Sequence, residues 1–489
     1  MSSTTSPALP SQTDNPRKRA LRERVDATLE EIERWRRYNA AYHDDDRKFM
    51  RFLIPPGKRV LELGCGSGHM LAALQPSHGV GVDFSEKAVE RARLHYPHLQ
   101  FVLGDVEDAA TLQAIEGPFD YIVLADTIGL LEDIDGTLRL IHQLCSPSTR
   151  LIIAYYSHLW EPVLRSAEAV GLRNKQPQFN YIATADFLNL MDLADFEVIS
   201  QEQRQLLPRR WLGLGPLINK YIAPLPGIRQ LCLRTYLVGR PVRLFPERKY
   251  SASIVIPCRN ERGNIENAIL RMPRFASHQE IIFVEGNSSD DTFAECERVR
   301  DAYKDQWDIK VLRQDGKGKG DAVRKGFAAA TGDVLFILDA DLTVPPEDLP
   351  KFYAAISEGV GEFINGSRLV YPMEGEAMRL LNSIGNKAFG MALSAVLEQR
   401  LKDTLCGTKV LFRRDYDRIA DNRSFFGDFD PFGDFDLLFG AAKQNLKIVE
   451  MPVRYRARLY GDTKISRFRH GAMLLRMTAY AFSRFKTAY

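Results

Sequence analysis

The sequence Phe336-Ile337-Leu338-Asp339-Ala340-Asp341 is an apolar run that ends in two carboxylates one residue apart. Side chains at positions i and i+2 of a strand point to the same face, so Asp339 and Asp341 can reach one cation where the run stops. Two carboxylates in this position suit a divalent metal held against a diphosphate. An Asp-x-Asp at a strand end also forms solvated turns and helix caps, so the neighbouring sequence has to decide between the two interpretations.

Strand-like apolar runs alternate with helical segments on both sides of this motif. The runs are residues 59–63, 80–82, 100–103, 121–124 and 151–154 in the first half and residues 253–256, 280–284, 310–312, 334–338 and 363–366 in the second. Such alternation predicts parallel sheets with crossover helices. A chain of 489 residues is too long for a single core. We therefore expect an α/β protein with two successive domains.

Composition predicts where these domains begin and end. Residues 1–20 are rich in Ser, Thr and Pro and are expected to form a disordered arm. Residues 206–249 are rich in Pro and Arg and are expected to form a basic connector. The first domain then spans residues 21–205, with one or two amphipathic helices over residues 21–52. The second domain spans residues 250–465, and a basic amphipathic tail follows at residues 466–489.

Positive charge is concentrated in the connector and the tail. The chain has a net charge of +3, but residues 202–249 and residues 454–489 together carry +16, so the remainder carries −13. This distribution favours an anionic surface or a polyphosphate ligand, and a solvated charged face is the plainer alternative. Nucleic acid is not an expected partner, because neither basic segment belongs to a recognisable binding module.

The cysteines and the hydropathy of the chain indicate the cellular compartment in which we expect the protein. The six cysteines contain no C-x-x-C pair and the chain shows no signal peptide, so we expect reduced thiols and a cytoplasmic location. No stretch of 18 uncharged apolar residues is present, so no membrane-spanning helix is expected. Residues 211–238 and 471–482 come nearest to one, and both could lie in a membrane interface.

The first half contains a glycine-rich turn directly after its first strand. The sequence reads Val60-Leu61-Glu62-Leu63-Gly64-Cys65-Gly66-Ser67-Gly68. Glycines let the backbone pass close to a ligand, and the following helix offers unpaired N–H groups. Asp83 closes the second strand, where a carboxylate can accept hydrogen bonds from a ribose diol, and Asp105 follows the third. Each acid could instead cap a helix or form a turn.

This G-x-G-x-G turn, preceded by Glu62 and followed by the two acids, resembles the class I S-adenosylmethionine-dependent methyltransferases over about residues 40–205. The resemblance implies a Rossmann-like sandwich that binds S-adenosylmethionine. The methionine part would lie along the glycine loop, the ribose would bind Asp83, and the adenine would lie beside Asp105 and Val106. The residues assigned to the cofactor are Glu62, Gly64, Gly66, Gly68, Asp83, Asp105 and Val106.

The methyl acceptor is not identified by the sequence. Methyl transfer is an in-line displacement that the enzyme mostly aligns, and a hydroxyl acceptor also benefits from a base. The candidates after the fourth and fifth strands are Asp126, His142 and His158, with Tyr155 and Tyr156 as walls. A packing or capping role is open for each of them.

A second group of motifs surrounds Asp339 and Asp341. One strand-like run ends in Pro257-Cys258-Arg259-Asn260-Glu261, and the next ends in Val284-Glu285-Gly286. The sequence Gly316-Lys317-Gly318-Lys319-Gly320-Asp321-Ala322 forms a basic loop that could cover phosphates. Prolines at 345 and 346 predict the start of a helix.

This succession resembles the family 2 glycosyltransferases of the GT-A fold, and most closely the branch that contains dolichol-phosphate mannose synthase, over about residues 250–465. The resemblance implies inverting transfer of a sugar from a nucleotide diphosphate donor, with Asp339 and Asp341 holding Mg²⁺ or Mn²⁺. The residues assigned to the nucleotide sugar are Pro257, Arg259, Glu261, Glu285, Lys319, Asp321, Asp339, Ala340, Asp341, Arg368, Arg458 and Lys464.

Three positions depart from the pattern of that branch. Arg259 stands where the mannose synthases have an aromatic residue, so the base would stack on a guanidinium. Glu285-Gly286 retains one carboxylate of an acidic pair. Thr343 replaces a third metal ligand that is usually Gln, so water would complete the metal's coordination. The identity of the sugar and of the nucleotide is therefore not predicted, whereas the reaction class is.

Glycosylation of a hydroxyl needs a carboxylate base in this family, and Asp434 and Asp436 lie where one is expected. Either residue could instead cap the helix that begins near Leu437. A phosphate acceptor needs no base. The mannose synthase branch acts on polyprenyl phosphates, which implies a polyprenyl-phosphate or lipid-linked glycan acceptor for this chain.

The tail fits two arrangements. Apolar residues such as Leu474, Leu475 and Met477 alternate with Arg476 and Arg484, as in a helix that lies on an anionic membrane. Packing against the protein's own core explains the same pattern. The first arrangement predicts peripheral attachment at the inner face of the membrane.

The sequence thus predicts a bifunctional enzyme, in which a metal-dependent glycosyltransferase is joined to a methyltransferase of a related, glycan-like substrate. Two alternatives remain. In the first, the N-terminal half binds the cofactor or a partner without catalysis. In the second, the C-terminal half is a nucleotide-sugar-binding scaffold, which the intact Asp339 and Asp341 argue against.

Overall fold

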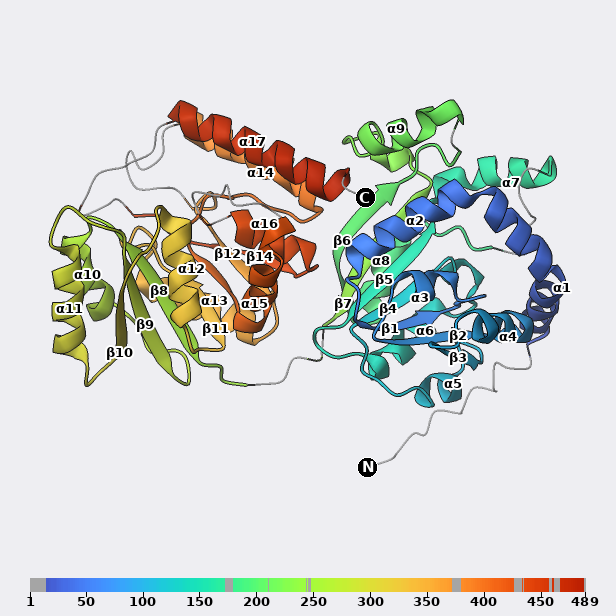
Figure 1. Cartoon of the computed structure of the whole chain (residues 1–489), viewed down its shortest axis with the longest axis horizontal. Coiled ribbons are helices and arrows are strands. Elements are labelled where there is room, and N and C mark those ends of the chain that lie inside the picture. Colours follow the sequence, from blue (N-terminus) through green and yellow to red (C-terminus); the bar gives the residue numbers. More distant parts are fainter. Residues whose placement is uncertain are drawn as a thin grey trace. The chain divides into compact units, whose positions relative to one another are not determined.

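The computed structural model describes residues 15–171, 179–209, 211–242, 244, 248–371, 380–425, 433, 435–456, 460 and 467–487. The chain divides into two compact units, with the boundary between residues 244 and 245. Within the described residues each unit contains one seven-stranded sheet, and the elements are labelled in Figure 1. Each unit is an α/β sandwich, which confirms the predicted fold class of two successive α/β domains.

The sheet of the first unit has the strand order β3-β2-β1-β4-β5-β7-β6. Its strands are β1 (Arg59–Leu63), β2 (His78–Asp83), β3 (Gln100–Leu103), β4 (Tyr121–Ala125), β5 (Arg150–Tyr156), β6 (Phe196–Arg204) and β7 (Arg234–Pro241). The pairs among β1 to β5 are parallel, and β7 runs antiparallel to both β5 and β6. The five predicted strands are present, but the sheet is mixed and not wholly parallel.

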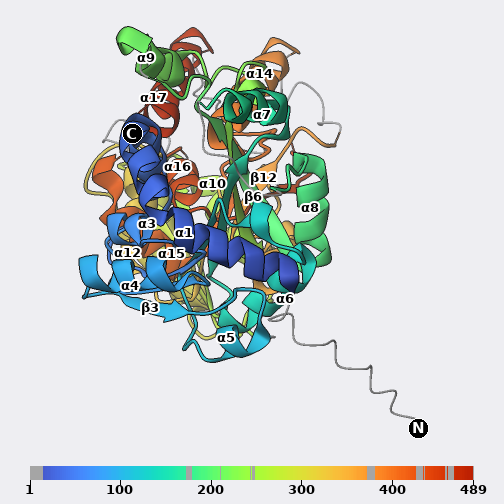
Figure 2. The same ribbon diagram turned by 90° about the vertical axis from the view of Figure 1, so that its right-hand side faces the viewer.

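Helices cover both faces of this sheet, and Figure 2 shows α3 and α4 on one side and α6 and α8 on the other. The helices are α1 (Pro16–Tyr38), α2 (Ala40–Leu53), α3 (His69–Ala73), α4 (Glu86–His95), α5 (Ala109–Gln113), α6 (Ile134–Ile141), α7 (Glu161–Ala169), α8 (Thr184–Leu193) and α9 (Leu214–Tyr221). Successive residues of β1 divide between the two faces, because strand side chains alternate. Leu61 and Leu63 belong to one buried cluster and Val60 to the other.

Two predicted boundaries of this unit were wrong. The expected connector at residues 206–249 contains α9 and β7, and β7 is buried at every position between β5 and β6. Its arginines concealed the strand, since Arg240 and Arg234 are buried only because carboxylates pair with them. The expected disordered arm ends early, because α1 begins at Pro16, with Asn15 accepting a hydrogen bond from the backbone N–H of Arg17.

The sheet of the second unit has the strand order β10-β9-β8-β11-β13-β12-β14. Its strands are β8 (Ala252–Cys258), β9 (Gln279–Glu285), β10 (Asp308–Arg313), β11 (Val334–Ile337), β12 (Phe363–Ser367), β13 (Lys409–Phe412) and β14 (Ile448–Pro452). Strand β13 lies between β11 and β12 and is antiparallel to both, so this sheet is also mixed. The apolar runs predicted β8 to β12, whereas β13 and β14 were not predicted from the sequence.

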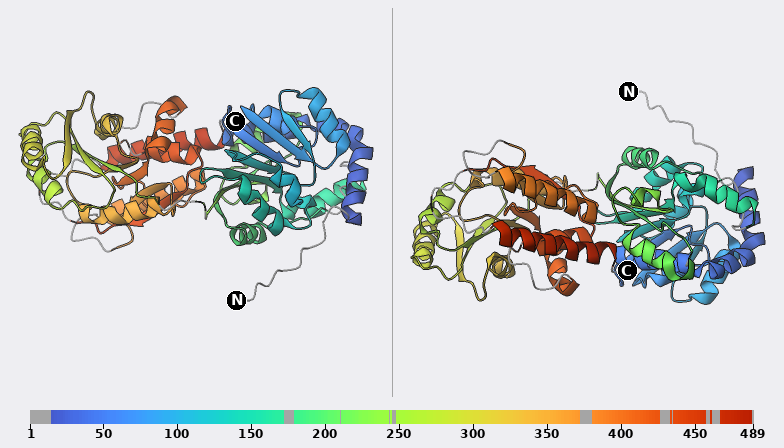
Figure 3. Two further views of the ribbon diagram at one scale, coloured as in Figure 1. Left: turned by 90° about the horizontal axis from the view of Figure 1, so that it is seen from below. Right: turned by 90° about the horizontal axis from the view of Figure 1, so that it is seen from above.

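The helices of this unit include two long ones near its C-terminal end. They are α10 (Arg262–Leu270), α11 (Thr292–Tyr303), α12 (Lys319–Ala329), α13 (Leu349–Ser357), α14 (Leu380–Leu397), α15 (Arg413–Asp421), α16 (Phe435–Lys443) and α17 (Arg467–Lys486). Helix α17 packs against α14 (Figure 3) and buries Leu474 and Met477, whereas Leu475 is 64% exposed. Among the helices of the described ranges, none combines the length and the apolar character that a bilayer crossing requires.

Candidate functional sites

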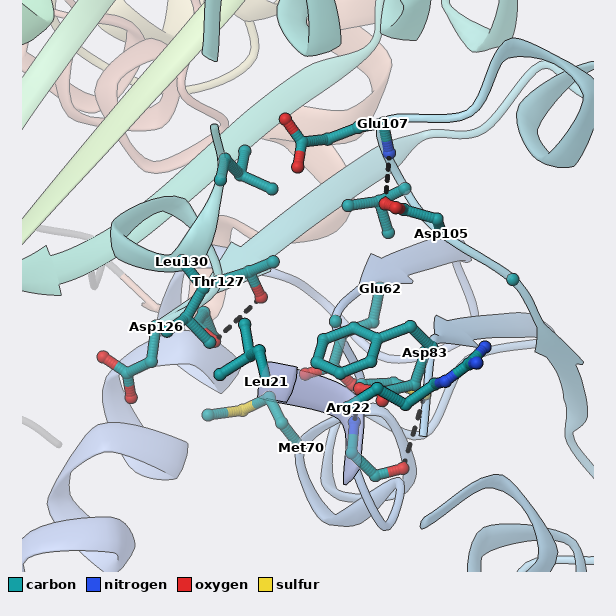
Figure 4. A pocket seen from close by; sticks show the side chains of 18 of the residues that line it. Leu21, Arg22, Glu62, Met70, Asp83, Asp105, Glu107, Asp126, Thr127 and Leu130 are labelled. Carbon is teal, nitrogen blue, oxygen red and sulfur yellow. Dashed lines mark hydrogen bonds between the residues drawn. The ribbon is translucent and has the colours of Figure 1, made fainter. Parts of the chain in front are cut away.

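A cavity of about 510 Å³ opens at the carboxyl ends of β1, β2 and β4 in the first unit. Of the residues that the sequence analysis assigned to the cofactor, six line this cavity: Glu62, Gly64, Gly66, Asp83, Asp105 and Val106. Figure 4 shows Glu62 and Asp83 near its middle, with Asp105 and Asp126 at opposite sides. Gly68 does not line it. Gly68 precedes α3 with φ of 77°, and a Cβ there would lie 2.7 Å from the ring of Phe101.

The glycine turn holds the end of β1 against the end of β2. Gly64 and Gly66 have φ of 78° and 50°, a region that favours glycine. A Cβ on Gly64 would also overlap the side chain of Thr127, whose hydroxyl donates to the carbonyl of Leu63 at 2.8 Å. The backbone N–H of Gly66 donates to Oδ2 of Asp83 at 2.7 Å. The turn therefore brings the backbone and Asp83 to the same part of the cavity.

Asp83 is buried and already hydrogen-bonded by the backbone. Its Oδ1 accepts from the N–H of Ser85 at 2.9 Å, and its Oδ2 accepts from Gly66. Burial raises the pKa of Asp83, and these two hydrogen bonds oppose the rise. Each carboxylate oxygen has two lone pairs, so two further hydrogen bonds from a diol can be accepted. The predicted ribose-binding role fits this geometry.

Glu62 is only 2% exposed and lies on the same cavity. Its Oε2 accepts from the N–H of Leu71 in α3 at 2.9 Å, which ties the start of that helix to β1. Burial raises the pKa of Glu62 to about 8, although the hydrogen bond from Leu71 and the charge of Arg36 act in the opposite direction. The carboxyl group is therefore largely protonated at neutral pH. A bound ammonium group beside it would favour its ionised form.

Asp105 and Glu107 hold a lysine that the sequence analysis placed in the disordered arm. The ammonium group of Lys18, in α1, lies 2.6 Å from Oδ2 of Asp105 and 2.7 Å from Oε2 of Glu107. Burial lowers the pKa of Lys18, but the two carboxylates outweigh it and the net change is upward. Leu21 and Arg22 of the same helix also line the cavity (Figure 4). Helix α1 thus forms one wall of the site.

Asp126 and charged groups of α2 also line the cavity, and Arg234 of β7 pairs with two of these residues. Asp126, with φ of 64°, forms an ion pair with Arg234, whose guanidinium also lies 3.3 Å from Oδ1 of Asp46. His43 lines the same cavity. Burial and, after it, the charge of Arg36 lower the pKa of His43 to about 4, so its imidazole is neutral at pH 7. No sequence motif marked His43.

Among the candidate bases for methyl transfer, the structure brings only Asp126 to this cavity. Nε2 of His142 lies 2.5 Å from the carbonyl of Ala194, and its ring stacks on Phe196. His158 begins a short 3₁₀ helix outside the lining. The two tyrosines predicted as walls are not lining residues either: Tyr155 stacks on Phe187 in the core. His142 and Tyr155 therefore have packing roles.

The second site lies where β8, β9 and β11 end. These strands are neighbours in the sheet, and Pro257 and Cys258 are in register with Val284 and Glu285. Asp339 follows β11 directly after Leu338, whose N–H donates to Val255. Parallel strands place their carboxyl ends at one edge. The structure therefore brings together Pro257, Glu285 and Asp339, which the sequence analysis grouped at the nucleotide sugar.

Asp339 forms an ion pair with Lys319, with 2.6 Å between Nζ and Oδ1. Burial raises the pKa of Asp339, but Lys319 outweighs burial and the net change is downward. Oδ1 of Asp341 accepts from the hydroxyl of Thr343 at 2.8 Å and from its N–H. Thr343, at the position of the expected third metal ligand, therefore orients the carboxylate of Asp341. Within the described residues no cluster of three or more His, Cys, Asp or Glu side chains forms a metal cage.

The donor set fits a magnesium-like ion. Mg²⁺ and its relatives are commonly held by one or two carboxylates together with substrate phosphates and water. Asp339 and Asp341 supply the two carboxylates, and the ammonium of Lys319 shows that a cation is accommodated beside Asp339. The backbone of Gly407, a residue that no sequence motif marked, packs against Asp339 and Lys319. A Cβ at position 407 would overlap the carboxylate of Asp339 and the ammonium of Lys319.

The loops after β8 and β9 are joined by hydrogen bonds. The N–H of Asn260 donates to Ser288 Oγ at 2.9 Å, and the N–H of Glu261 donates to Thr292 Oγ1 at 3.0 Å. Oε1 of Glu285 accepts from the N–H of Ser288 at 2.5 Å. Arg259, the first residue of the loop after β8, is exposed. The two loops that carry the residues predicted to bind the nucleobase therefore hold each other in place.

Other assigned residues have structural partners. Arg368 binds Asp403 through Nε and Nη2 at 2.7 and 2.8 Å, and this pair lowers the pKa of Asp403 to about 2 despite burial. Oδ2 of Asp321 accepts from the N–H of Gly316 at 2.8 Å and so shapes the glycine-rich loop. Ala340 is buried in the core. Because Nε and Nη2 of Arg368 bind Asp403, a contact of Arg368 with a phosphate would use Nη1.

Asp436, one of the two proposed bases, is buried in the first turn of α16. Its Oδ2 lies 3.9 Å from a guanidinium nitrogen of Arg324 and 3.8 Å from one of Arg423. This position fits the alternative in which the carboxylate stabilises the helix start. Asp434, Arg458 and Lys464 lie outside the described residues, so their predicted roles are neither supported nor opposed.

Comparison with known proteins agrees with this division. A family model described as "Methyltransferase domain" matches residues 32–201, and one described as "Glycosyl transferase family 2" matches residues 253–419. A dolichol-phosphate mannosyltransferase of Pyrococcus furiosus is 29% identical over 44% of this chain and 58% of its own length. A dolichyl-phosphate hexose transferase of Haloferax volcanii is 29% identical over 45% of this chain and 90% of its own length.

Among solved structures, a SAM-dependent methyltransferase of Thermotoga maritima is 18% identical, with a TM-score of 0.35, over 45% of this chain and 99% of its own. This chain spans just under six tenths of the length of the Pyrococcus relative. Both family models match within the units that the structure separates. The chain therefore contains two domains that match known families, a methyltransferase domain at residues 32–201 and a glycosyl transferase family 2 domain at residues 253–419.

Proposed function

We propose that the chain is a bifunctional enzyme. Its second domain transfers a sugar, with inversion, from a nucleotide diphosphate donor to a polyprenyl-phosphate or glycan acceptor, and requires Mg²⁺ or Mn²⁺. Its first domain methylates a related glycan precursor with S-adenosylmethionine. The observation that carries the proposal is the position of Asp339 and Asp341 after β11, beside Pro257 and Glu285 at the ends of β8 and β9.

In sugar transfer, the chain's residues bind the donor and bring charge to its diphosphate. A metal ion, when bound, neutralises the developing charge of the leaving group. Asp339 and Asp341 would hold that ion, and Lys319, which pairs with Asp339, is placed to bring its ammonium to a donor phosphate. The exposed guanidinium of Arg259 is available to stack on the base, and Glu285 is available to the nucleoside.

The acceptor is proposed to be a phosphate. Asp436 is held by two guanidinium groups, which favours a structural role over that of a base. A phosphate oxygen is already ionised and needs no base. The relatives described as dolichol-phosphate and dolichyl-phosphate transferases agree with this choice. We accordingly propose that the enzyme works peripherally at the inner face of an anionic membrane, aided by the basic residues of α17.

Methyl transfer is proposed for the cavity of the first domain. S-adenosylmethionine, when bound, supplies an electrophilic methyl group. Asp83 binds the ribose, Glu62 faces the methionine part, and Asp105 flanks the adenine. His43 is neutral and is placed to take a proton from the acceptor, and Arg36 and Arg47 of the same lining suit an acceptor that carries negative charge.

Two experiments separate this proposal from its rivals. Calorimetric titration with S-adenosylmethionine, paired with a methyl-transfer assay on lipid-linked glycans, tests the first domain. Tight binding without turnover on any acceptor would favour a cofactor-binding module. For the second domain, hydrolysis of UDP- and GDP-sugars is measured with and without Mn²⁺. Hydrolysis that proceeds at the same rate without Mn²⁺ and in Asp341→Ala would refute the metal-dependent mechanism.

A further inference from the structure

The segment between β6 and β7 exposes an unusual number of large apolar side chains. Seven of them are at least 40% exposed, and we call this set the α9 patch: Leu212, Leu214, Leu217, Tyr221, Ile222, Leu225 and Leu231. Leu214, Leu217 and Tyr221 lie at positions i, i+3 and i+7 of α9, so they share one face of that helix. Scattered apolar residues are normal on a surface, but seven in one short segment, three of them on one helix face, favour an interaction site.

Helix α7 extends this surface. Leu159, Val163 and Val170, in and beside α7, are each more than half exposed. The indole N–H of Trp160 donates to the carbonyl of Leu231 at 2.7 Å, which fastens the start of α7 to the end of the α9 patch. Figures 1 and 2 show α7 and α9 at the same end of the first unit. None of the α9 patch residues lines the cofactor cavity, so methyl transfer does not explain their exposure.

Within its own segment of the chain, the α9 patch is flanked by cations and not by acids. No Asp or Glu occurs from residue 203 to residue 246. Lys220 is exposed on α9, 5.7 Å from the ring centre of Tyr221, and Arg209 lies over Tyr38 at 5.8 Å. Aliphatic side chains, a tyrosine and flanking cations are found on surfaces that enter the headgroup region of a bilayer. The adjoining α7 carries two acids, Glu161 and Glu168, and Glu161 pairs with Arg165.

We propose that the α9 patch docks the methyltransferase domain on an anionic phospholipid bilayer. Charge complementarity selects this occupant over a second copy of the chain. In a symmetric dimer, each patch would face its own cations with no carboxylate from residues 203–246 to pair with them. The inference extends the membrane association proposed above, but it does not rest on sugar transfer or on α17.

Flotation of the full chain with vesicles tests it. Phosphatidylcholine vesicles with and without phosphatidylglycerol are titrated against wild type, Leu214→Ser/Leu217→Ser and Lys220→Ala. The double variant is expected to need about tenfold more anionic lipid, or more, for half-binding. Lys220→Ala is expected to need about fivefold more. Leu94→Ser is the matched control, because Leu94 is 80% exposed in α4 of the same unit and lies outside the patch.

Three results would overturn the proposal. One is the absence of wild-type binding to anionic vesicles, and another is unchanged binding of a folded double variant. The third is a wild-type dimer in sedimentation that the double variant converts to a monomer, because the occupant would then be a second copy. Thermal unfolding followed by circular dichroism checks the fold of each variant. Mn²⁺-dependent donor hydrolysis, measured in parallel, separates failure of this inference from failure of the proposed sugar transfer.

Discussion

Gly407→Ala is expected to disable the proposed metal site without changing any residue that touches metal or donor. Gly407 lies between α14 and β13, and its backbone passes directly beside the pair formed by Asp339 and Lys319. An added Cβ would lie 2.6 Å from Cγ of Asp339 and would overlap both its carboxylate oxygen and the ammonium of Lys319. Real Cβ atoms do not approach so closely, so the carboxylate or the loop has to move.

The magnitude follows from that displacement. Relief of the overlap requires a movement of roughly 1 Å, and misplacement on that scale lowers the rates of enzymes about 100-fold. The loss should appear both in kcat and in the Mn²⁺ concentration needed for half-maximal rate, because the displaced group is itself a proposed ligand. A general loss of stability would instead lower the amount of folded enzyme and leave the Mn²⁺ dependence unchanged.

The assay is release of nucleotide from the donor over a Mn²⁺ titration, with urea unfolding measured on the same samples. Gly385→Ala is the matched control, because a Cβ at Gly385 of α14 meets nothing within 4 Å. It should keep wild-type kinetics and gain about 0.5–1 kcal/mol in helix stability. Wild-type kcat and Mn²⁺ dependence in Gly407→Ala would show that Asp339 does not hold the ion.

Four further predictions follow from the two sites. Asp339→Ala should lower turnover at least about 100-fold, and wild-type rates in the donor assay would contradict the metal assignment. Asp83→Ala should weaken S-adenosylmethionine binding by about 1.5–3 kcal/mol through lost charged hydrogen bonds, as checked by calorimetry, and an unchanged affinity would remove Asp83 from the ribose. Because the pKa of Glu62 rises from 4.5 to about 8 on folding, its contribution to stability is full below pH 4.5 and is lost as the pH rises through 8. Glu62→Gln should therefore flatten the fall in unfolding free energy between pH 5 and pH 8, by on the order of 3 kcal/mol in urea titrations; an identical pH profile would refute a buried, protonated Glu62. His43→Asn should lower methyl transfer while S-adenosylmethionine binding stays within about twofold, and a parallel loss of both would indicate a structural role.

The position of α1 links cofactor binding to the N-terminal residues. Lys18 spans Asp105 and Glu107, and Glu33 of the same helix lies 3.1 Å from Nε2 of His69 in α3. Helix α1 therefore closes one side of the cavity through its contacts with Asp105, Glu107 and His69. A truncation that removes α1 would expose Asp105 and Glu107 and leave their charges without Lys18.

The sequence predicted the strands that carry the chemistry well. The runs that became β1 to β5 and β8 to β12 are short, apolar and bounded by turn residues, so their local pattern determines them. Strands β6, β7, β13 and β14 were missed. Strand β7 carries Arg234 and Arg240, and β13 begins at Lys409, so neither pattern suggests burial. The two arginines are buried because distant carboxylates pair with them, as Asp46 and Asp126 pair with Arg234, and Lys409 donates to the nearby carbonyl of Cys406 at 2.6 Å.

By itself, the sequence determined the two-domain α/β organisation, the glycine turn at Gly64 to Gly68 and the carboxylates at Asp83, Asp105, Asp339 and Asp341. These features depend on neighbours within a few residues, so a linear pattern records them. Only the tertiary structure placed Lys18 between Asp105 and Glu107, His43 among the charges of α1 and β7, and the backbone of Gly407 against Asp339. The contacts of Lys18 and Gly407 join residues that are 68 or more positions apart, whereas His43 also has neighbours on α1 and α2. Helix and strand periodicity relates only residues close in the sequence, so it does not predict the distant contacts.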